Sequence, residues 1–376
     1  MFFIQSHVRP RPEIALDQRE KFLQRLQQVQ QQSNLLGMIR CRIRRCSSLH
    51  IINFHNQRTW NVQGATLQRP FLQNVIPVIL EVVEKRLDKL EYARQKIAYC
   101  YFSVAATLIF PKLSDARKFW AKNGALVTVV DDFFDVGSSE EELVNLVQLI
   151  EEKALVAVLK TLRSYIQQST ALFVRLDTAV SWQGRNVTSH IVEIWLDVLK
   201  SMLKEAEWSK TKTFPTFDEY MIPGHVSLAL GPLVLSAVYF VGPKLSKEVV
   251  RSPEFCNLFK HMGTCGCLFN DIQTFKRESK EGKWNAVSMQ MSHSVTAEEI
   301  IKKIRARIDN ERRELLRLVL VEMENRSIVP RACKDLFWNM SKVLHLLYIK
   351  DDEFTKHDML NAVNEVIHEP ISVDEL

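Results

Sequence analysis

The pattern of apolar and polar positions along the chain is that of a helical protein. Residues 71–109 read as continuous helix up to Pro111, and residues 119–128 have the spacing of a buried helix. Residues 191–208 are amphipathic at the helical period, while residues 298–325 alternate Glu with Lys and Arg at spacings that allow i,i+4 pairs. No strand-rich segment with regular turns is found. The pattern predicts an all-α fold.

The most apolar run, residues 226–240, is interrupted by Gly231 and Pro232. A helix that spans a membrane needs about 20 apolar residues, so this run is short for a span, and the proline breaks it midway. A kinked helix beside an apolar cavity is the better interpretation. Leu233 and Val234, which directly follow the break, are then expected to face that cavity.

An aspartate cluster, Asp131, Asp132 and Asp135, lies inside an otherwise apolar stretch. Carboxylates are costly to bury without cations, so a positive partner is expected. On a helix Asp131 and Asp135 share one face, whereas Asp132 points about 100° away. Two carboxylates on one face suit Mg²⁺, an ion commonly held by one or two carboxylates and a substrate's phosphates. An acidic helix end on the surface remains an alternative at this point.

A second set of oxygen ligands follows at positions i, i+4 and i+8. Asn270, Thr274 and Glu278 therefore share one face of a helix, and each offers an oxygen to a metal ion. Two separate faces of this kind fit a site in which metal ions bridge a diphosphate from both sides.

With these two motifs the sequence resembles the class I plant terpene synthases, and most closely the ent-kaurene synthase group of diterpene synthases. DDxxD and (N,D)D-x-x-(S,T)-x-x-x-E are that family's magnesium-binding motifs. Four further stretches look like the same group: residues 86–96, 113–117, 182–190 and 278–287. The resemblance runs from about residue 86 to the C-terminus. It divides the chain into a divergent, basic segment 1–85 and a catalytic α domain 86–376.

The resemblance implies an all-α helical barrel, the class I terpenoid synthase (isoprenoid synthase) fold, with both metal motifs at one mouth. Three Mg²⁺ ions are expected, with Mn²⁺ possible as a substitute. The implied roles are these: catalytic, Asp131, Asp132 and Asp135; metal-binding, Asp131, Asp135, Asn270, Thr274 and Glu278; diphosphate-binding, Arg94, Lys96 and Lys283; cavity wall, Trp120, Phe134, Leu233, Val234 and Tyr239.

The implied reaction is ionisation of a prenyl diphosphate followed by cyclisation. The Asp-x-Asp-Asp motif needed for protonation-initiated cyclisation is absent from the sequence. The expected substrate is therefore an already bicyclic C20 diphosphate such as ent-copalyl diphosphate, or a linear prenyl diphosphate. The product would be ent-kaurene or a related diterpene of gibberellin-type biosynthesis.

Three departures from the family pattern favour an alternative. Residues 1–85 do not match the family, residues 153–181 do not match it between its two motifs, and Cys267 stands where the family carries an arginine, one turn before Asn270. A neutral thiol cannot replace a guanidinium that binds a diphosphate oxygen. A catalytically impaired or inactive relative, retained as a helical protein from a truncated gene, therefore stays open.

The charge distribution bears on nucleic-acid binding, and the cysteine content bears on disulfides and zinc binding. Of the net charge of +6, residues 1–70 contribute eleven Lys and Arg against three Asp and Glu, so the remainder is near neutral. This balance argues against nucleic acid as a partner of the catalytic region. Seven cysteines without an evident secretory signal predict reduced thiols, and a zinc cluster of His261, Cys265 and Cys267 lacks a fourth ligand.

The location and the oligomeric state are less constrained. The arginine-rich N-terminus and the resemblance favour a plastid location, although the segment has few serines for a transit peptide, and a cytoplasmic location stays open. A small-molecule prenyl diphosphate is the expected partner and no transmembrane span is expected. The sequence leaves the oligomeric state undetermined.

Overall fold

The computed structural model describes residue 94 and residues 97–108, 113–137, 139–152, 176–291, 295–321 and 327–348. The expectations for residues 1–85, for Lys96 and for most of the divergent stretch 153–181 lie outside these residues.

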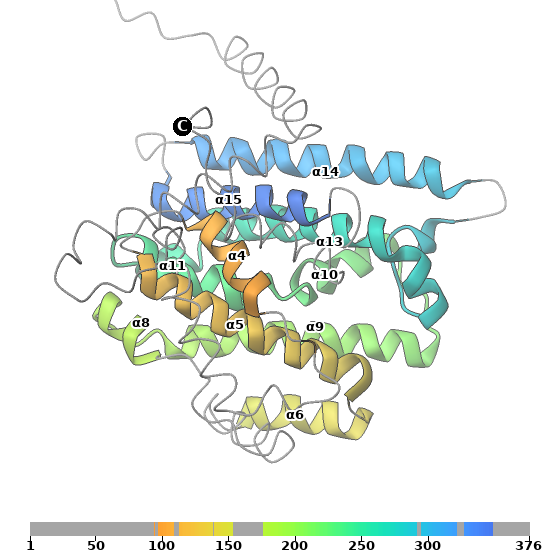
Figure 1. Cartoon of the computed structure of the whole chain (residues 1–376), viewed down its shortest axis with the longest axis horizontal. Coiled ribbons are helices and arrows are strands. Elements are labelled where there is room, and N and C mark those ends of the chain that lie inside the picture. The colour runs from red at the N-terminus through yellow and green to blue at the C-terminus, as the bar shows by residue number, and fades with distance from the viewer. Residues whose placement is uncertain are drawn as a thin grey trace, which may run out of the picture.

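The described residues form helices, and no strand is found among them (Figure 1). The helices are α4 (Ile97–Thr107), α5 (Ser114–Asp132), α6 (Glu140–Glu152), α8 (Leu176–Gln183), α9 (Thr188–Thr211), α10 (Phe217–Ser227), α11 (Ser236–Val241), α12 (Lys247–Val250), α13 (Pro253–Glu281), α14 (Ala297–Leu320) and α15 (Arg331–Leu347). Short π-helical turns, η4 (Phe133–Gly137) and η5 (Gly231–Leu235), and a 3₁₀ turn, η6 (Ser288–Gln290), complete the set. The predicted all-α fold is confirmed.

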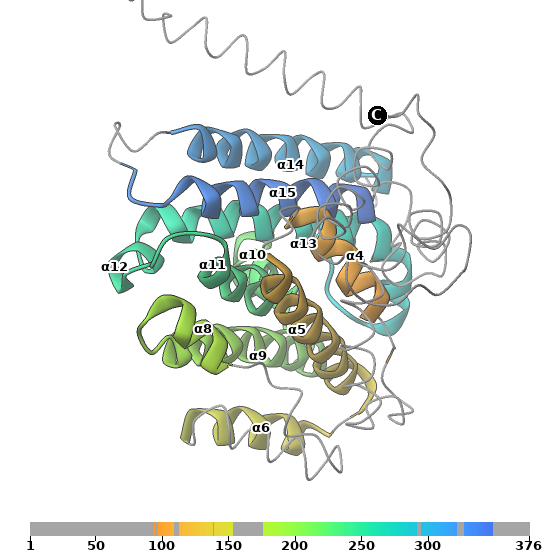
Figure 2. The same ribbon diagram turned by 60° about the vertical axis from the view of Figure 1, so that its left-hand side comes forward.

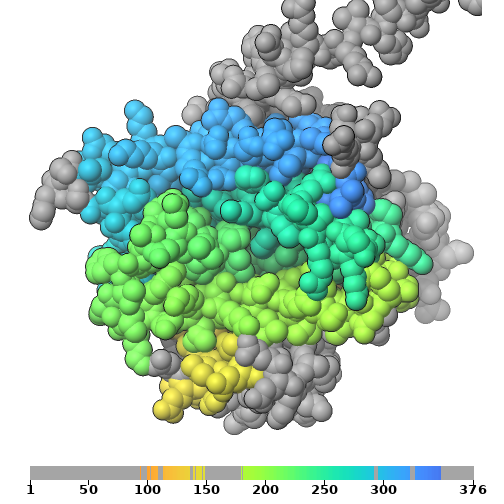
Figure 3. All heavy atoms as spheres, turned by 180° about the vertical axis from the view of Figure 1, so that it is seen from behind, coloured from red at the N-terminus to blue at the C-terminus, as the bar shows by residue number. Residues whose placement is uncertain are grey.

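The helices are stacked in layers around α13. In Figures 1 and 2, α14 is outermost on one side, α15 and α13 lie beneath it, and α5, α9 and then α6 follow on the other side. Helix α13 contacts α10, α14 and α15, while α5 contacts α4 and η5. Seen from behind, α14 runs across the upper part of the molecule and α9 across the lower part, with α10 to α13 between them (Figure 3).

Helix α13 has a capping residue at each end, and a glycine in its interior allows α10 to pack closely against it. The Ser252 side chain accepts a hydrogen bond from the Phe255 amide at the start, and Gly282 ends the helix with a φ of 74°. At Gly263 an added Cβ would lie 2.5 Å from the backbone oxygen of His225. Only glycine allows α10 to approach this closely, and the approach fixes α10 beside the helix that carries the second motif.

The break in the apolar run begins earlier than expected. Helix α10 ends at Ser227, Ala229 adopts a φ of 57°, and the chain resumes as η5 at Gly231. A left-handed residue ends the helix before Pro232, and proline is tolerated in the first turn of the next element. No single described helix is long and apolar enough to cross a membrane; α10 and residues 231–241, bent by 45°, pass that test only as a pair.

A buried ion pair fixes α15 against α13. The Lys334 side chain is 1% exposed, its Nζ lies 2.6 Å from Glu254 Oε1, and it also donates to the backbone oxygens of Leu318 and Val321 at 3.0 and 2.8 Å. Replacing Lys334 with methionine would remove the cation from Glu254 and this donor from the backbone oxygens of Leu318 and Val321. We expect a loss of about 3 kcal/mol in the free energy of unfolding, measured by chemical denaturation.

The matched control is the Arg331–Asp335 pair on the same helix, whose side chains are mostly exposed. Arg331→Met should cost less than about 1 kcal/mol, because a solvent-exposed ion pair contributes little. Equal losses for the two variants would contradict the structural role of Lys334.

Candidate active site

A cavity of about 620 Å³ opens between α5, α9, α10, α13 and α15. Most of its charged residues lie near or just past the C-terminal ends of α5, α9 and α13, while Arg94 precedes α4 and Asp271 lies within α13. Its apolar residues come mainly from earlier turns of α5 and α9 and from α10 to α15. Helix C-termini carry partial negative charge, which favours cations at this end. The apolar part is lined by Trp120, Val127, Met202, Leu228, Leu230, Leu233, Met340 and Leu344.

The first aspartate motif straddles the end of α5. Asp131 and Asp135 both line the cavity, although η4 replaces the expected α-helical turn after Asp132. Asp132 is 5% exposed and does not line the cavity. The Arg94 amide and Nε donate to Asp132 at 2.6 and 2.7 Å, and Nη2 donates to Asp131 at 2.7 Å. Asp132, which the sequence predicts to be catalytic, thus holds Arg94 and does not line the cavity.

The two cavity-facing aspartates crowd negative charge together. Withdrawal from bulk solvent and, next, the neighbouring Asp135 carboxylate raise the pKa of Asp131, Arg94 opposes the shift, and the net pKa is about 6. A carboxylate in this situation is stabilised by an added cation. The arrangement therefore has the electrostatic requirement of a cation site.

The second motif lies on α13, where its three residues meet as the spacing predicts. Asn270 and Glu278 line the cavity, whereas Thr274 is 2% exposed and does not line it; its hydroxyl donates to the Asn270 backbone oxygen at 3.0 Å. Asn285 Nδ2 donates to Glu278 Oε2 at 2.8 Å and lies 3.4 Å from Thr274 Oγ1. Asn285 therefore holds Glu278 beside Thr274, and this contact was not predicted because Asn285 follows the helix instead of sharing its face.

Asp271, next to the first ligand of this motif, has a different function. Its Oδ2 accepts hydrogen bonds from the Tyr220 hydroxyl at 3.0 Å and from the Ala286 amide at 2.9 Å. It therefore ties α10 and the segment after α13 to the motif. Asn270 Nδ2 in turn donates to the Tyr348 hydroxyl at 3.3 Å, which adds the end of α15 to the same network.

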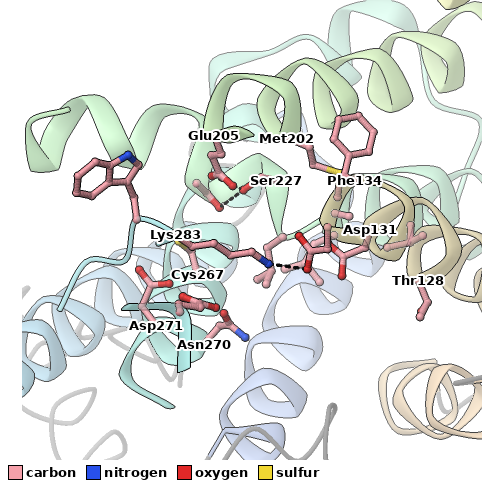
Figure 4. A pocket seen from close by; sticks show the side chains of 18 of the residues that line it. Thr128, Asp131, Phe134, Met202, Glu205, Ser227, Cys267, Asn270, Asp271 and Lys283 are labelled. Carbon is pink, nitrogen blue, oxygen red and sulfur yellow. Dashed lines mark hydrogen bonds and ion pairs between the residues drawn. The ribbon is translucent and has the colours of Figure 1, made fainter. Parts of the chain in front are cut away.

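The two motifs meet at one end of the cavity, as expected. Lys283 Nζ, from the segment after α13, lies 2.7 Å from Asp135 Oδ2 and 3.5 Å from Glu281 Oε2 (Figure 4). Of the three cations predicted to bind diphosphate, Arg94 and Lys283 line the cavity, and Lys96 lies outside the described residues.

The donor atoms fit a hard cation. Within the described ranges no three His, Cys, Asp or Glu side chains converge on a single point, and this finding removes the zinc interpretation of His261, Cys265 and Cys267. Asp131 and Asp135 on one side, and Asn270, Thr274 and Glu278 on the other, instead offer oxygen alone. Mg²⁺ favours such ligands and usually completes its coordination with waters and substrate phosphates.

Three of the five predicted wall residues, Trp120, Phe134 and Leu233, line the cavity. The prediction is wrong for Val234 and Tyr239, which are both 0% exposed and buried in the core, outside the lining. Val234 neighbours Leu233, and adjacent residues of a helix cannot face the same side. Tyr239 turns away, with its hydroxyl 2.5 Å from His190 Nδ1.

Sequence reasoning missed a carboxyl group inside the cavity. Glu205 of α9 lines the wall, and its Oε1 accepts a hydrogen bond from Ser227 Oγ at 2.7 Å (Figure 4). Burial, opposed by the Ser227 hydrogen bond and supported by the carboxylates of Glu278 and Asp131, raises the pKa of Glu205 to about 7. The sequence shows that α9 is amphipathic, but it does not show which of its residues face a cavity.

The comparisons with known proteins agree with this geometry. The model of the terpene synthase family, metal binding domain, matches residues 84–314, well over half of the chain. Ent-kaurene synthase-like 1 from Ricinus communis is 57% identical over 305 residues, covering 77% of this chain and 40% of the relative. The chloroplastic ent-kaurene synthase of Marrubium vulgare is 52% identical over 298 residues, covering 77% and 39%. The chain spans about two fifths of the length of these relatives.

Solved structures share the fold. Abietadiene synthase from Abies grandis matches with a TM-score of 0.69 and 24% identity, covering 81% of this chain and 41% of that one. Isoprene synthase from grey poplar, in complex with three Mg²⁺ ions and dimethylallyl-S-thiolodiphosphate, matches with a TM-score of 0.71 and 20% identity, covering 86% and 64%. On the family match and the similarity to these relatives, the chain belongs to the terpene synthase family.

Proposed function

We propose that this chain is a Mg²⁺-dependent class I diterpene synthase that ionises and cyclises a prenyl diphosphate. The observation that carries the proposal is the meeting of two oxygen-ligand motifs at the charged end of one cavity, where Lys283 joins Asp135 across it. The proposed substrate is ent-copalyl diphosphate and the proposed product ent-kaurene or a related diterpene. The names of the relatives from Ricinus communis and Marrubium vulgare support this choice.

The residues divide the work along the cavity. Asp131 and Asp135 would hold metal ions on one side, and Asn270, Thr274 and Glu278 on the other; bound Mg²⁺ supplies Lewis-acid neutralisation of the leaving diphosphate. Arg94 and Lys283, which pair with Asp131 and Asp135, would bind diphosphate oxygens. The apolar wall of the cavity would exclude water that could quench a carbocation. The cavity volume is in the range of small-molecule sites.

The test is incubation of the purified chain with Mg²⁺ and, separately, ent-copalyl, geranylgeranyl and farnesyl diphosphates, with products identified by gas chromatography. A diterpene hydrocarbon from the bicyclic substrate supports the proposal. Products from the linear substrates alone would correct the substrate. No product and no diphosphate release from any of the three would favour the alternative, an inactive helical relative.

Metal removal should abolish turnover. Because all the proposed ligands are oxygen atoms, we expect activity to vanish in excess chelator and to return with Mg²⁺ or Mn²⁺. Calorimetry gives a second measurement, since inorganic diphosphate should bind tightly only when the divalent ion is present. Equal binding of diphosphate with and without the metal would contradict the assigned ligands.

A plastid location is part of the same proposal. The curated relative from Marrubium vulgare is named chloroplastic, as is the one from Stevia rebaudiana. A fluorescent protein fused to the C-terminus of the full chain should accumulate in plastids of leaf cells. Fluorescence spread through the cytoplasm would contradict this location.

A further inference from the structure

Helix α9 presents one stripe of side chains to the cavity, and the chemistry of this stripe changes along its length. Met202, Glu205 and Ser209, and then Lys212 directly after the helix, follow one another from the apolar interior to the charged end. Glu205 is the innermost charged residue of the stripe. It therefore lies where the charged end of the cavity gives way to the apolar wall.

A hydrogen bond fixes the direction of the Glu205 carboxyl group. Ser227, the last residue of α10, donates to Glu205 Oε1 at 2.7 Å, and the same hydroxyl lies 3.4 Å from the Gly224 backbone oxygen. The hydroxyl can therefore turn to Gly224 when the carboxyl group changes its protonation state. Ser227 also immediately precedes the helix break, so the carboxyl group is held beside the apolar turn that contains Leu228.

Glu205 differs from Asp131, Asp135 and Glu278 in having no cationic partner among the described residues. Asp131, Asp135 and Glu278 have Arg94, Lys283 and Arg277 within 4 Å, whereas no ion pair to Glu205 is found in the described part of the chain. The Oδ2 atom of Asp271 already accepts hydrogen bonds from Tyr220 of α10 and from the amide of Ala286 after α13. Glu205 is thus the carboxyl group of the wall that neither a cation nor a metal motif engages.

We propose that Glu205 accepts the proton that ends the reaction, an inference that rests on the proposed function. The carbon next to the cationic centre loses a hydrogen, the electrons of its C–H bond form the product's double bond, and the proton bonds to a Glu205 carboxylate oxygen. Glu205 is then a neutral acid that returns its proton to solvent after product release. No oxidant, reductant or further reactant is required.

The first experiment compares product composition. Glu205→Gln keeps the size of the side chain and a hydrogen bond with Ser227, but an amide is a poor proton acceptor. We expect the share of the principal olefin to fall about tenfold, in favour of isomeric olefins and alcohols formed from the same cations. This effect is smaller than that usual for a general base, because the released diphosphate can also accept a proton.

The control variant is Glu207→Gln on the same helix. Glu207 does not line the cavity and pairs with Lys204 on the surface. Its product composition should match that of the wild type. The alternative is that Glu205 only holds α9 to α10. In that case Ser227→Ala would lower the melting temperature, while Glu205→Gln would leave the product composition unchanged. That pair of results would overturn the proposal.

A second experiment does not depend on turnover. The probe is a bicyclic C20 tertiary amine, an ammonium ion at neutral pH that mimics the carbocation, added with Mg²⁺ and inorganic diphosphate. Its affinity, measured by calorimetry, should fall about tenfold in Glu205→Gln and stay unchanged in Glu207→Gln. Equal affinities in the wild type and Glu205→Gln would overturn the assignment.

Failure of the proposed function is distinguishable from failure of this inference. A folded wild-type chain that releases neither diphosphate nor product overturns both. An active wild type whose product composition is unaffected by Glu205→Gln overturns the role of Glu205 alone, because ionisation by the metal motifs then stands without it.

Discussion

Asp131→Asn should lower the rate of diphosphate release by about a thousandfold or more. Asp131 lies at the end of α5 on the cavity wall and is proposed to bind Mg²⁺ together with Asp135. Asparagine keeps the shape but removes the charge that holds a hard cation, and metal stabilisation of a leaving group is worth several kcal/mol. The measurement is release of inorganic diphosphate from ent-copalyl diphosphate under saturating Mg²⁺.

Asp132→Asn is the matched control, one residue away on the same helix. Asp132 is buried and accepts two hydrogen bonds from Arg94, so its loss should displace Arg94 without removing a metal ligand. We expect a decrease of about ten- to a hundredfold, together with a lower melting temperature. Equal rates of diphosphate release for the two variants would contradict the assignment of Asp131 to metal binding and of Asp132 to holding Arg94.

The site was most predictable where function follows from local periodicity. Asn270, Thr274 and Glu278 come together because a helix repeats every 3.6 residues, and α13 is unbroken through all three. Asp131 and Asp135 still face one cavity although η4 widens the turn between them, so the prediction tolerated a local change of helix type.

The other features depend on tertiary contacts that a single sequence does not display. Glu205 and Asn285 act through partners on other segments, Ser227 on α10 and Glu278 on α13. The helix break was placed at Gly231 because glycine and proline interrupt helices, yet it begins with the left-handed backbone of Ala229, which has no special sequence signal. Packing against neighbouring helices decides such positions.

Cys267 marks the acidic side of the cavity. Its side chain is 5% exposed, lines the cavity, and lies so close to α10 that a Cβ added at Gly224 would be 3.1 Å from Sγ. Burial raises the pKa of the Cys267 thiol well above its usual range, and the carboxylates of Asp271 and Glu205 add to the shift. The residue is therefore a neutral thiol at a place where negative charge has accumulated.

Cys267→Arg should raise the rate of ionisation of ent-copalyl diphosphate by about ten- to a hundredfold, or create turnover where the wild type has none. Position 267 is one helical turn before Asn270, so a guanidinium there can reach the same end of the cavity as the metal ligands. A hydrogen bond to a charged group is worth about 1.5–3 kcal/mol, and that energy corresponds to the expected change in rate.

The control for this prediction is Cys267→Met, which lengthens the side chain without adding charge. If charge is the missing element, methionine should leave the rate unchanged or lower it, because it fills the cavity, while arginine raises it. The carboxylates of Asp271, Glu205 and Glu278 give the new guanidinium partners in the substrate-free protein, so its burial is compensated. An arginine variant that is folded but no faster than the wild type would show that Cys267 does not stand in the place of a diphosphate-binding cation.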